Sequence, residues 1–142
     1  MNSIKIYHHS SRGVGSALKL KLIPFVYGDP RSGKLVITIA KQDGDEYDWS
    51  RAMYENLDFE DVARMLQVFR GETESINDGA GITHWFVHKL NMTHVIEPIC
   101  GYEITLTNGD RVATFTLKPA EALGISLALE HSMAKLVFEM EK

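Results

Sequence analysis

Apolar and polar residues alternate in the first part of the chain, and this alternation predicts strands. The predicted strand from Ser16 to Tyr27 begins with leucine at every second position and mostly lysine between, a period of two that leaves one face buried. A second strand, Lys34 to Lys41, is rich in β-branched residues, and a short strand at Ile4 to His8 precedes both. The turn-forming segment Gly28 to Gly33 predicts that the two longer strands form a hairpin.

Two helices are predicted from apolar residues at helical spacing. Asp58 is placed to cap the first, which is amphipathic and is predicted to end at about Arg70, before Gly71. The second begins near Pro119 and is predicted to run to about Phe138. Between them we expect a glycine-rich loop at Asn77 to Gly81, then strands at Ile82 to Leu90, Val95 to Ile99, Tyr102 to Thr107 and Arg111 to Leu117, the last two joined by the hairpin-forming Asn108-Gly109.

A weak internal repeat links the two halves of the chain. Six positions recur at a constant offset of 60 residues: Leu57, Asp61, Val62, Met65, Val68 and Phe69 correspond to Leu117, Glu121, Ala122, Ile125, Ala128 and Leu129. The pattern predicts one α+β domain over residues 1–142, built from two antiparallel sheets that are each followed by a helix, with pseudo-repeats at about 4–71 and 82–138. Apolar matches at helical spacing also arise by chance, so duplication and coincidence both stay open at this point.

The second predicted helix is apolar around much of its circumference. Besides its main stripe, which includes Ile125 and Leu129, it carries Leu123 and Leu127 on other sides. A helix of this kind is buried on most sides. We therefore expect it either to pack against another chain through a symmetric interface or to be covered by the first helix of the same chain.

Composition indicates a single soluble domain. A length of 142 residues with 44% hydrophobic residues is enough to bury a core. No apolar stretch is long enough for a membrane helix and the N-terminus lacks the order of a secretory signal, so no membrane partner is expected. The single cysteine, Cys100, excludes an internal disulfide and indicates a reducing, cytoplasmic location.

Charge is distributed unevenly along the chain. The net charge is −4, but residues 1–41 hold seven basic residues against Asp29 alone, while the remainder holds eight basic against eighteen acidic residues. This asymmetry predicts a local surface for a polyanion on an otherwise acidic body. A random distribution of solvated charges is the alternative interpretation.

No motif in the sequence predicts a nucleotide-binding loop, a metal site or a catalytic residue. The segment Gly28 to Lys34 has the spacing of a phosphate-binding P-loop, but no Ser or Thr follows Lys34 and the chain continues as a strand, so a hairpin turn is favoured. His84 and His88 on one strand face would lie about 13 Å apart, too far for one metal ion. Cys100 has no evident base beside it, and no nucleophile elbow occurs. We therefore expect no metal, no cofactor and no enzymatic activity.

The segment Tyr47 to Arg51 reads Tyr-Asp-Trp-Ser-Arg and is followed by Leu57 to Val62. It resembles the corresponding motif and first helix of the Whirly family. In the same order along the chain, Gly15 to Leu18 resembles the family's opening strand, and Phe115 to Glu121 resembles the entry to its second helix. The resemblance covers about Ile4 to Phe138.

This resemblance implies two four-stranded sheets, each followed by a helix, and sequence-independent binding of single-stranded DNA by homotetramers. In that family the helices form the central contacts, and bases are held against apolar and aromatic residues between neighbouring sheets. The resemblance fits a bacterial or phage setting, or an organelle if the chain is processed.

Our hypothesis is a single-stranded DNA-binding protein that acts in replication, recombination or repair. Candidate contacts are Arg12, Lys19, Lys21 and Lys34 for phosphates, Tyr27, Trp85 and Phe86 for base stacking, and Ser16 and Thr38 for hydrogen bonds. We expect Trp49 and Arg51 to be structural, with Arg51 neutralising the acidic run before it. The alternatives are an RNA-binding protein of the same fold and an oligomeric scaffold whose basic strands bind an acidic protein.

Overall fold

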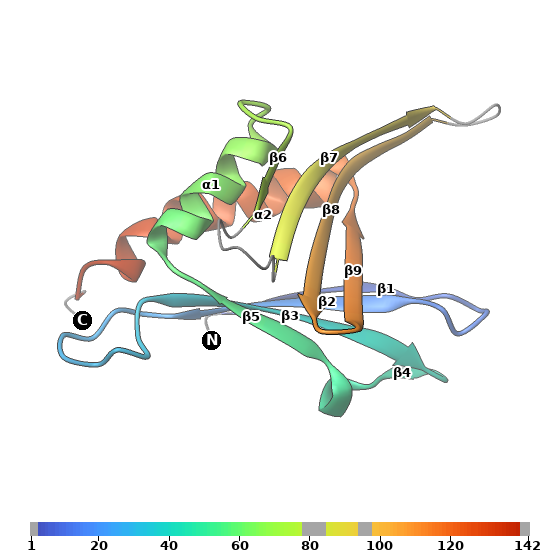
Figure 1. Ribbon diagram of the computed structural model, residues 1–142, viewed down its shortest axis with the longest axis horizontal. Coiled ribbons are helices and arrows are strands. Elements are labelled where there is room, and N and C mark those ends of the chain that lie inside the picture. The colour runs from blue at the N-terminus through green and yellow to red at the C-terminus, as the bar shows by residue number, and fades with distance from the viewer. Residues whose placement is uncertain (1–2, 78–84, 94–97, 140–142) are drawn as a thin grey trace.

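The computed structural model describes residues 3–77, 85–93 and 98–139, with side chains described throughout except at 77, 85–86, 88–93 and 98–100. These residues form two antiparallel sheets and two α-helices (Figure 1). The predicted α+β class, with a helix after each group of strands, is confirmed. None of the described helices combines the length and the apolar character that crossing a membrane requires.

The first sheet is built from the N-terminal half of the chain. Its strands β1 (Ser3–His8), β2 (Ser16–Ile23), β3 (Lys34–Asp43) and β5 (Met53–Leu57) lie side by side in that order, and the short β4 (Glu46–Tyr47) pairs with the end of β3. The register sets Leu18 opposite Ile39 and Leu20 opposite Ile37, and all four are buried. The leucine alternation therefore does mark the core face, as predicted.

The second sheet follows the first helix. It consists of β6 (Ser75–Asn77), β7 (Trp85–Thr93), β8 (Pro98–Asn108) and β9 (Arg111–Leu117), paired in sequence order. The predicted tight turn between the last two strands is present, with Gly109 at a φ of 61° that favours glycine.

Both helices begin with a carboxylate that turns back onto the backbone. In α1 (Phe59–Phe69), the Asp61 side chain accepts from the Asp58 N–H at 3.1 Å while Asp58 accepts from the Asp61 N–H at 2.9 Å. In α2 (Pro119–Ser132), Glu121 accepts from the Lys118 N–H at 2.9 Å. The capping carboxylates thus occupy corresponding positions in the two halves of the chain.

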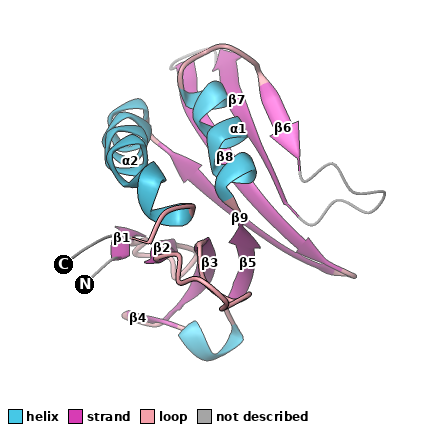
Figure 2. Cartoon of the chain, turned by 90° about the vertical axis from the view of Figure 1, so that its left-hand side faces the viewer, coloured by secondary structure: helices cyan, strands magenta, loops and turns pink. Residues whose placement is uncertain are grey.

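The helices lie side by side on one side of the first sheet and against the second (Figures 1 and 2). Both sheets and both helices contribute to one apolar core, in which Leu57, Leu117 and Phe115 have at most 1% of their surface exposed. Arg70 Nε donates to Glu130 Oε1 at 2.7 Å and joins the two helices at the surface. Despite this contact, Leu123 and Leu127 of α2 remain 60% and 58% exposed, so the first helix does not cover the apolar second helix completely.

The structure corrects several predicted boundaries. The strand predicted to reach Tyr27 ends at Ile23, because Pro24 cannot donate a hydrogen bond to the sheet. The helix predicted to reach Phe138 ends at Ser132 and continues as the 3-10 turn η2 (Met133–Leu136). Strands β4, β5 and β6 have no counterpart among the predicted elements.

The two strands predicted on either side of Cys100 are one strand, β8. Gly101 continues this strand at a φ of 143°, and a Cβ atom at this position would collide with the carbonyl oxygen of Leu117. The glycine is therefore a point of close approach between strands rather than a break. The predicted strand residues 82–84 and 95–97, and the predicted loop residues 78–81, lie outside the described part of the chain.

Candidate nucleic-acid interface

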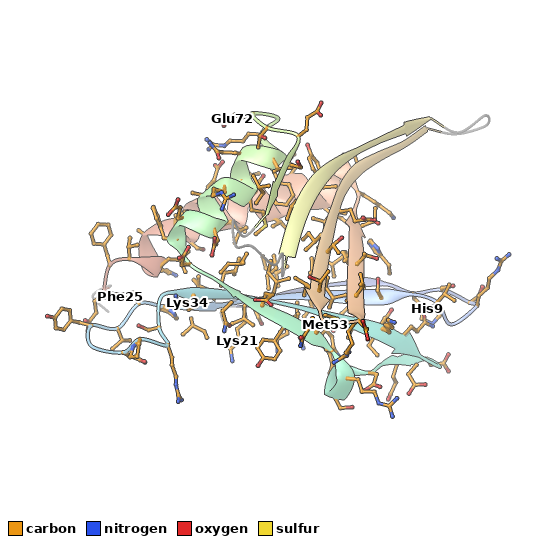
Figure 3. The ribbon with its side chains drawn as sticks, in the orientation of Figure 1. His9, Lys21, Phe25, Lys34, Met53 and Glu72 are labelled. Atoms are coloured by element: carbon orange, nitrogen blue, oxygen red, sulfur yellow. The ribbon has the colours of Figure 1, made fainter. Side chains whose placement is uncertain are left out.

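The basic residues of β2 lie on the side of the first sheet that faces away from the helices. Side chains alternate along a strand, so Lys19 and Lys21 point away from the buried leucines of the same strand. Lys21 is exposed and Lys19 is half-buried. Figure 3 shows Lys21 on the side of the sheet opposite the helices.

Strand register arranges this outward side into rows that cross the sheet. In one row, Lys5 of β1 is opposite Lys19, Lys19 is opposite Thr38 of β3, and Thr38 is opposite Tyr54 of β5. In the next row, Ser3, Lys21, Val36 and Asn56 follow one another in the same way. We call the surface made by both rows together with Lys34 the cationic face; its residues are Ser3, Lys5, Lys19, Lys21, Lys34, Val36, Thr38, Tyr54 and Asn56.

The cationic face has no carboxylate at any of its strand positions. Most of its lysines lie on different strands from most of its uncharged residues. Lys5, Lys19 and Lys21 belong to β1 and β2, whereas the central part of β3 and all of β5 contribute Val36, Thr38, Tyr54 and Asn56 to this side. On this side of the sheet, Lys34 at the start of β3 is the only charged residue that β3 and β5 contribute.

One end of the cationic face is bordered by β4 and the segment after it. In the row next to Lys5, Tyr7 is opposite Ala17 and Ala17 is opposite Ala40, and both alanines are 0% exposed. The Tyr47 ring lies over this end, with its centroid 5.2 Å from that of Tyr7. The Lys5 ammonium lies 5.9 Å from the Trp49 ring centroid, within the range of a cation–π interaction.

The segment Asp48 to Arg51, which carries the resemblance motif, is held by its own charges. Ser50 Oγ donates to Asp48 Oδ1 at 2.6 Å, and Arg51 Nε lies 3.6 Å from Asp48 Oδ2. The Ser50 hydroxyl, followed by the backbone and charge of Arg51, lowers the pKa of Asp48. Arg111 of β9 donates to the Arg51 carbonyl oxygen at 2.6 Å, so the second sheet also holds this segment. The Arg51 side chain thus pairs with one acid of the preceding run and is otherwise 86% exposed.

The structure brings Lys19, Lys21, Lys34 and Thr38 onto one face but places Arg12, Ser16 and Tyr27 elsewhere. Arg12 lies in the turn between β1 and β2. Tyr27 lies in the β2–β3 connection at the other end of the sheet, where its N–H donates to a carboxylate oxygen of Glu139 at 3.2 Å. For Trp85 and Phe86 the structure describes the backbone in β7 but not the side chains.

Ser16 points to the opposite side of the sheet from the lysines. It shares strand parity with Leu18 and lines a groove of about 710 Å³ between the first sheet and β9, together with His9, Thr114 and Thr116. This parity is visible in the sequence, since Ser16, Leu18 and the next two leucines fall at every second position. The two predicted hydrogen-bonding residues, Ser16 and Thr38, therefore lie on different faces.

Sequence reasoning did not select Lys5, Tyr54 or Asn56. The alternation of Ile4, Lys5 and Ile6 in the first strand was a usable signal for Lys5. No comparable signal exists for Tyr54 and Asn56, because the sequence of β5, Met-Tyr-Glu-Asn-Leu, does not alternate apolar and polar residues although its exposure does. Their place on the face follows from pairing between β3 and β5, which the sequence does not reveal.

The fold is that of the Whirly proteins. Whirly protein WHY1 from Arabidopsis thaliana superposes with a TM-score of 0.64 at 15% identity, covering 95% of this chain and 84% of that one. WHY3 from the same plant superposes with a TM-score of 0.61 at 16% identity, covering 95% of this chain and 88% of that one. A chain of MRP1/MRP2 from Trypanosoma bruciei superposes with a TM-score of 0.61 at 17% identity, covering 93% of this chain and 83% of that one.

At these low identities the superpositions show similarity of fold alone, and at that level they confirm the resemblance noted in the sequence. No protein-family model matches the sequence, and no curated protein matches it.

Proposed function

We propose that this protein binds single-stranded DNA without sequence preference, through the cationic face. The observation that carries the proposal is the common placement of Lys5, Lys19, Lys21 and Lys34 on one side of the first sheet, where the strand positions that form the cationic face include no carboxylate. Such a surface attracts phosphates whatever the base sequence. An exposed ring and short polar side chains on the same surface suit unpaired bases, whose flat faces and edges are accessible.

Duplex DNA is a poorer ligand for this surface. In a duplex the bases are stacked on one another and cannot lie on a protein ring without being flipped out, which costs a few kcal/mol. The cationic face is a sheet surface, not a helix or ribbon shaped to enter the major groove. The geometry therefore supports binding rather than catalysis, and unpaired rather than paired strands.

The active form is a homotetramer assembled through α2. Leu123 and Leu127 lie one turn apart on this helix and are exposed, whereas Ile125 and Leu129 are buried within the chain. Two exposed leucines on an otherwise apolar helix support contact with a second copy of the chain. The cationic face, on the far side of the first sheet from α2, stays accessible in such an assembly (Figure 1).

The cellular role that fits this chemistry is the coating of unwound DNA during replication, recombination or repair in the cytoplasm. An RNA-binding protein would use the same phosphate and stacking contacts, because these do not select the sugar. Competition between DNA and RNA oligomers of matched sequence separates the two roles. Stronger competition by RNA would overturn the preference for DNA.

The salt dependence of binding tests the cationic face directly. For a single strand, the logarithm of the binding constant falls with the logarithm of salt concentration at a slope of about −0.7 per neutralised phosphate. Replacing Lys19 and Lys21 by alanine is expected to flatten the slope by about 1.4, measured by fluorescence anisotropy of a labelled mixed-sequence oligomer. Lys118→Ala, which changes an exposed lysine at the start of α2, is the matched control. An unchanged slope in the double variant would show that the cationic face is not part of the binding site.

A further inference from the structure

The cationic face has a charged half and an uncharged half. In the row that crosses its middle, the order is Lys5, Lys19, Thr38 and Tyr54, so both ammonium groups lie on one side and the only ring lies at the other. The neighbouring row repeats this order, with Lys21 on β2 and Asn56 on β5. A nucleic acid strand has the same asymmetry, because its phosphates run along one edge and its bases project from the other.

Tyr54 is the ring that is open to a ligand on this face. Its side chain is 65% exposed, and within the described residues it makes no ring contact and no hydrogen bond. Trp49 differs, since the Lys5 ammonium already lies over its ring. Tyr7 also differs, because its ring already contacts the ring of Tyr47, with centroids 5.2 Å apart.

The spacing of the strands suits one nucleotide lying across the face. Adjacent strands are about 4.8 Å apart, so Lys19 and Tyr54, which are separated by β3, stand about 10 Å apart at the backbone. Thr38 lies between them. A phosphate at Lys19 therefore leaves its base above Thr38 or Tyr54, where a hydroxyl can meet the edge of the base and a ring can meet its flat side.

We propose that Tyr54 is a base-stacking residue: a single strand lies along β2, with its phosphates over Lys5, Lys19 and Lys21 and its bases over β3 and β5. This inference rests on the proposed function and adds an orientation to it. It also assigns a role in binding bases to the uncharged half of the face, which the charge distribution alone does not explain.

The test compares two ligands of equal length, an oligothymidine and an oligomer of abasic sugar–phosphate units. Tyr54→Thr removes the ring but keeps a residue that favours strands. We expect it to lower the affinity for oligothymidine by about 5-fold to 150-fold, the range of one stacked base, and to leave the affinity for the abasic oligomer unchanged. Tyr54→Phe retains the ring and is expected to bind oligothymidine like the natural chain.

Tyr27→Thr is the matched control, because Tyr27 is 85% exposed but lies off the face. Thermal unfolding of each variant verifies that the fold is retained. The stacking role would be overturned if Tyr54→Thr lowered the affinity for both ligands equally. It would also be overturned if Tyr54→Thr bound both ligands normally while Lys19→Ala with Lys21→Ala weakened the binding of both. Either result would leave the proposed function intact. If the natural chain binds neither ligand, or if the lysine substitutions have no effect, the proposed function fails as well.

Discussion

The Nε2 atom of His8, at the end of β1, lies 2.9 Å from Oε2 and 3.0 Å from Oε1 of Glu121, in the first turn of α2. The His8 ring also stacks on Phe115 of β9, with ring centroids 4.4 Å apart. Glu121 in turn accepts the hydrogen bond from the Lys118 N–H that caps the helix. One carboxylate thus joins the first sheet to the start of the second helix.

This arrangement predicts that stability depends on the ionisation of Glu121. Partial burial alone would raise the pKa of its carboxyl, but the Lys118 N–H and the His8 ring outweigh burial and hold the pKa below the ordinary 4.5. The folded chain therefore binds this proton less readily than the unfolded chain. The contribution of Glu121 to stability is present above pH 4.5 and is lost as pH falls through the lowered pKa.

Glu121→Gln is expected to reduce the free energy of unfolding at neutral pH and to make it less sensitive to acid. Urea unfolding at several pH values between about 3 and 7 measures both effects. Glu130→Gln, at another half-buried position of α2, provides a control. If the natural chain and the Glu121→Gln variant lose stability in parallel as pH falls, the interaction with His8 and Lys118 does not contribute as described.

Phe115 is predicted to be the most costly aromatic residue to remove from the described core. It is 1% exposed and supports the His8 ring. Phe115→Ala is expected to lower the free energy of unfolding by about 3–5 kcal/mol, which chemical denaturation measures. Phe138→Ala, at a position that is 65% exposed, should change stability by less than about 0.5 kcal/mol.

The ion pair between Arg70 and Glu130 is predicted to contribute little. It links α1 to α2, but both side chains are substantially exposed, at 55% and 33%. Arg70→Ala is therefore expected to cost less than about 1 kcal/mol, and the difference should shrink further in high salt. Thermal unfolding at low and high ionic strength is the measurement, and a large loss that persists in high salt would contradict this assignment.

Exposed leucines on α2 provide a test of assembly that is separate from folding. Replacing Leu123 and Leu127 by glutamate is expected to yield smaller particles with an unchanged fold, because neither leucine belongs to the core of its own chain. Analytical ultracentrifugation and circular dichroism measure the two properties. Gln67→Glu, on the exposed surface of α1, is the control. A natural chain that sediments as a monomer would refute the proposed tetramer.

Gly101 is predicted to resist substitution even by alanine. A methyl group there would meet the Leu117 carbonyl, and the φ of 143° disfavours any side chain, so Gly101→Ala should destabilise the fold by more than about 1 kcal/mol. Gly124→Ala is the opposite case, since nothing lies within 4 Å of its added Cβ in the helix α2. There the substitution is expected to stabilise by about 0.5–1 kcal/mol. Denaturant midpoints for both variants test the contrast.

Local patterns in the sequence were sufficient for elements with strong periodicity. The alternation from Ser16 onward, the Asp58 cap and the turn at Gly109 each rest on interactions between near neighbours, and all three are present in the structure. Predictions failed where the local structure depends on contacts between residues far apart in the sequence. Gly101 was interpreted as a break because its role depends on Leu117, which pairs with the next residue across the sheet.

The candidate site shows the same division. Lys19, Lys21 and Thr38 could be placed together because β2 and β3 form a hairpin with a predictable register. Tyr54 could not, since β5 crosses back to pair with β3 only after the chain has formed β4 and the 3-10 turn η1 (Trp49–Arg51). Pairing between segments separated by such a connection depends on the whole sheet and is not encoded in local periodicity.

The end of the cationic face bordered by β4 has a consequence for long ligands. If a strand lies along β2 as proposed, Tyr47 and Trp49 stand at the end of the face beyond Lys5 and hinder its continuation in that direction. Such a strand would extend instead over Lys21 and Lys34. The two ends of the cationic face are therefore unequal, so a strand bound as proposed would meet aromatic side chains at one end and lysines at the other.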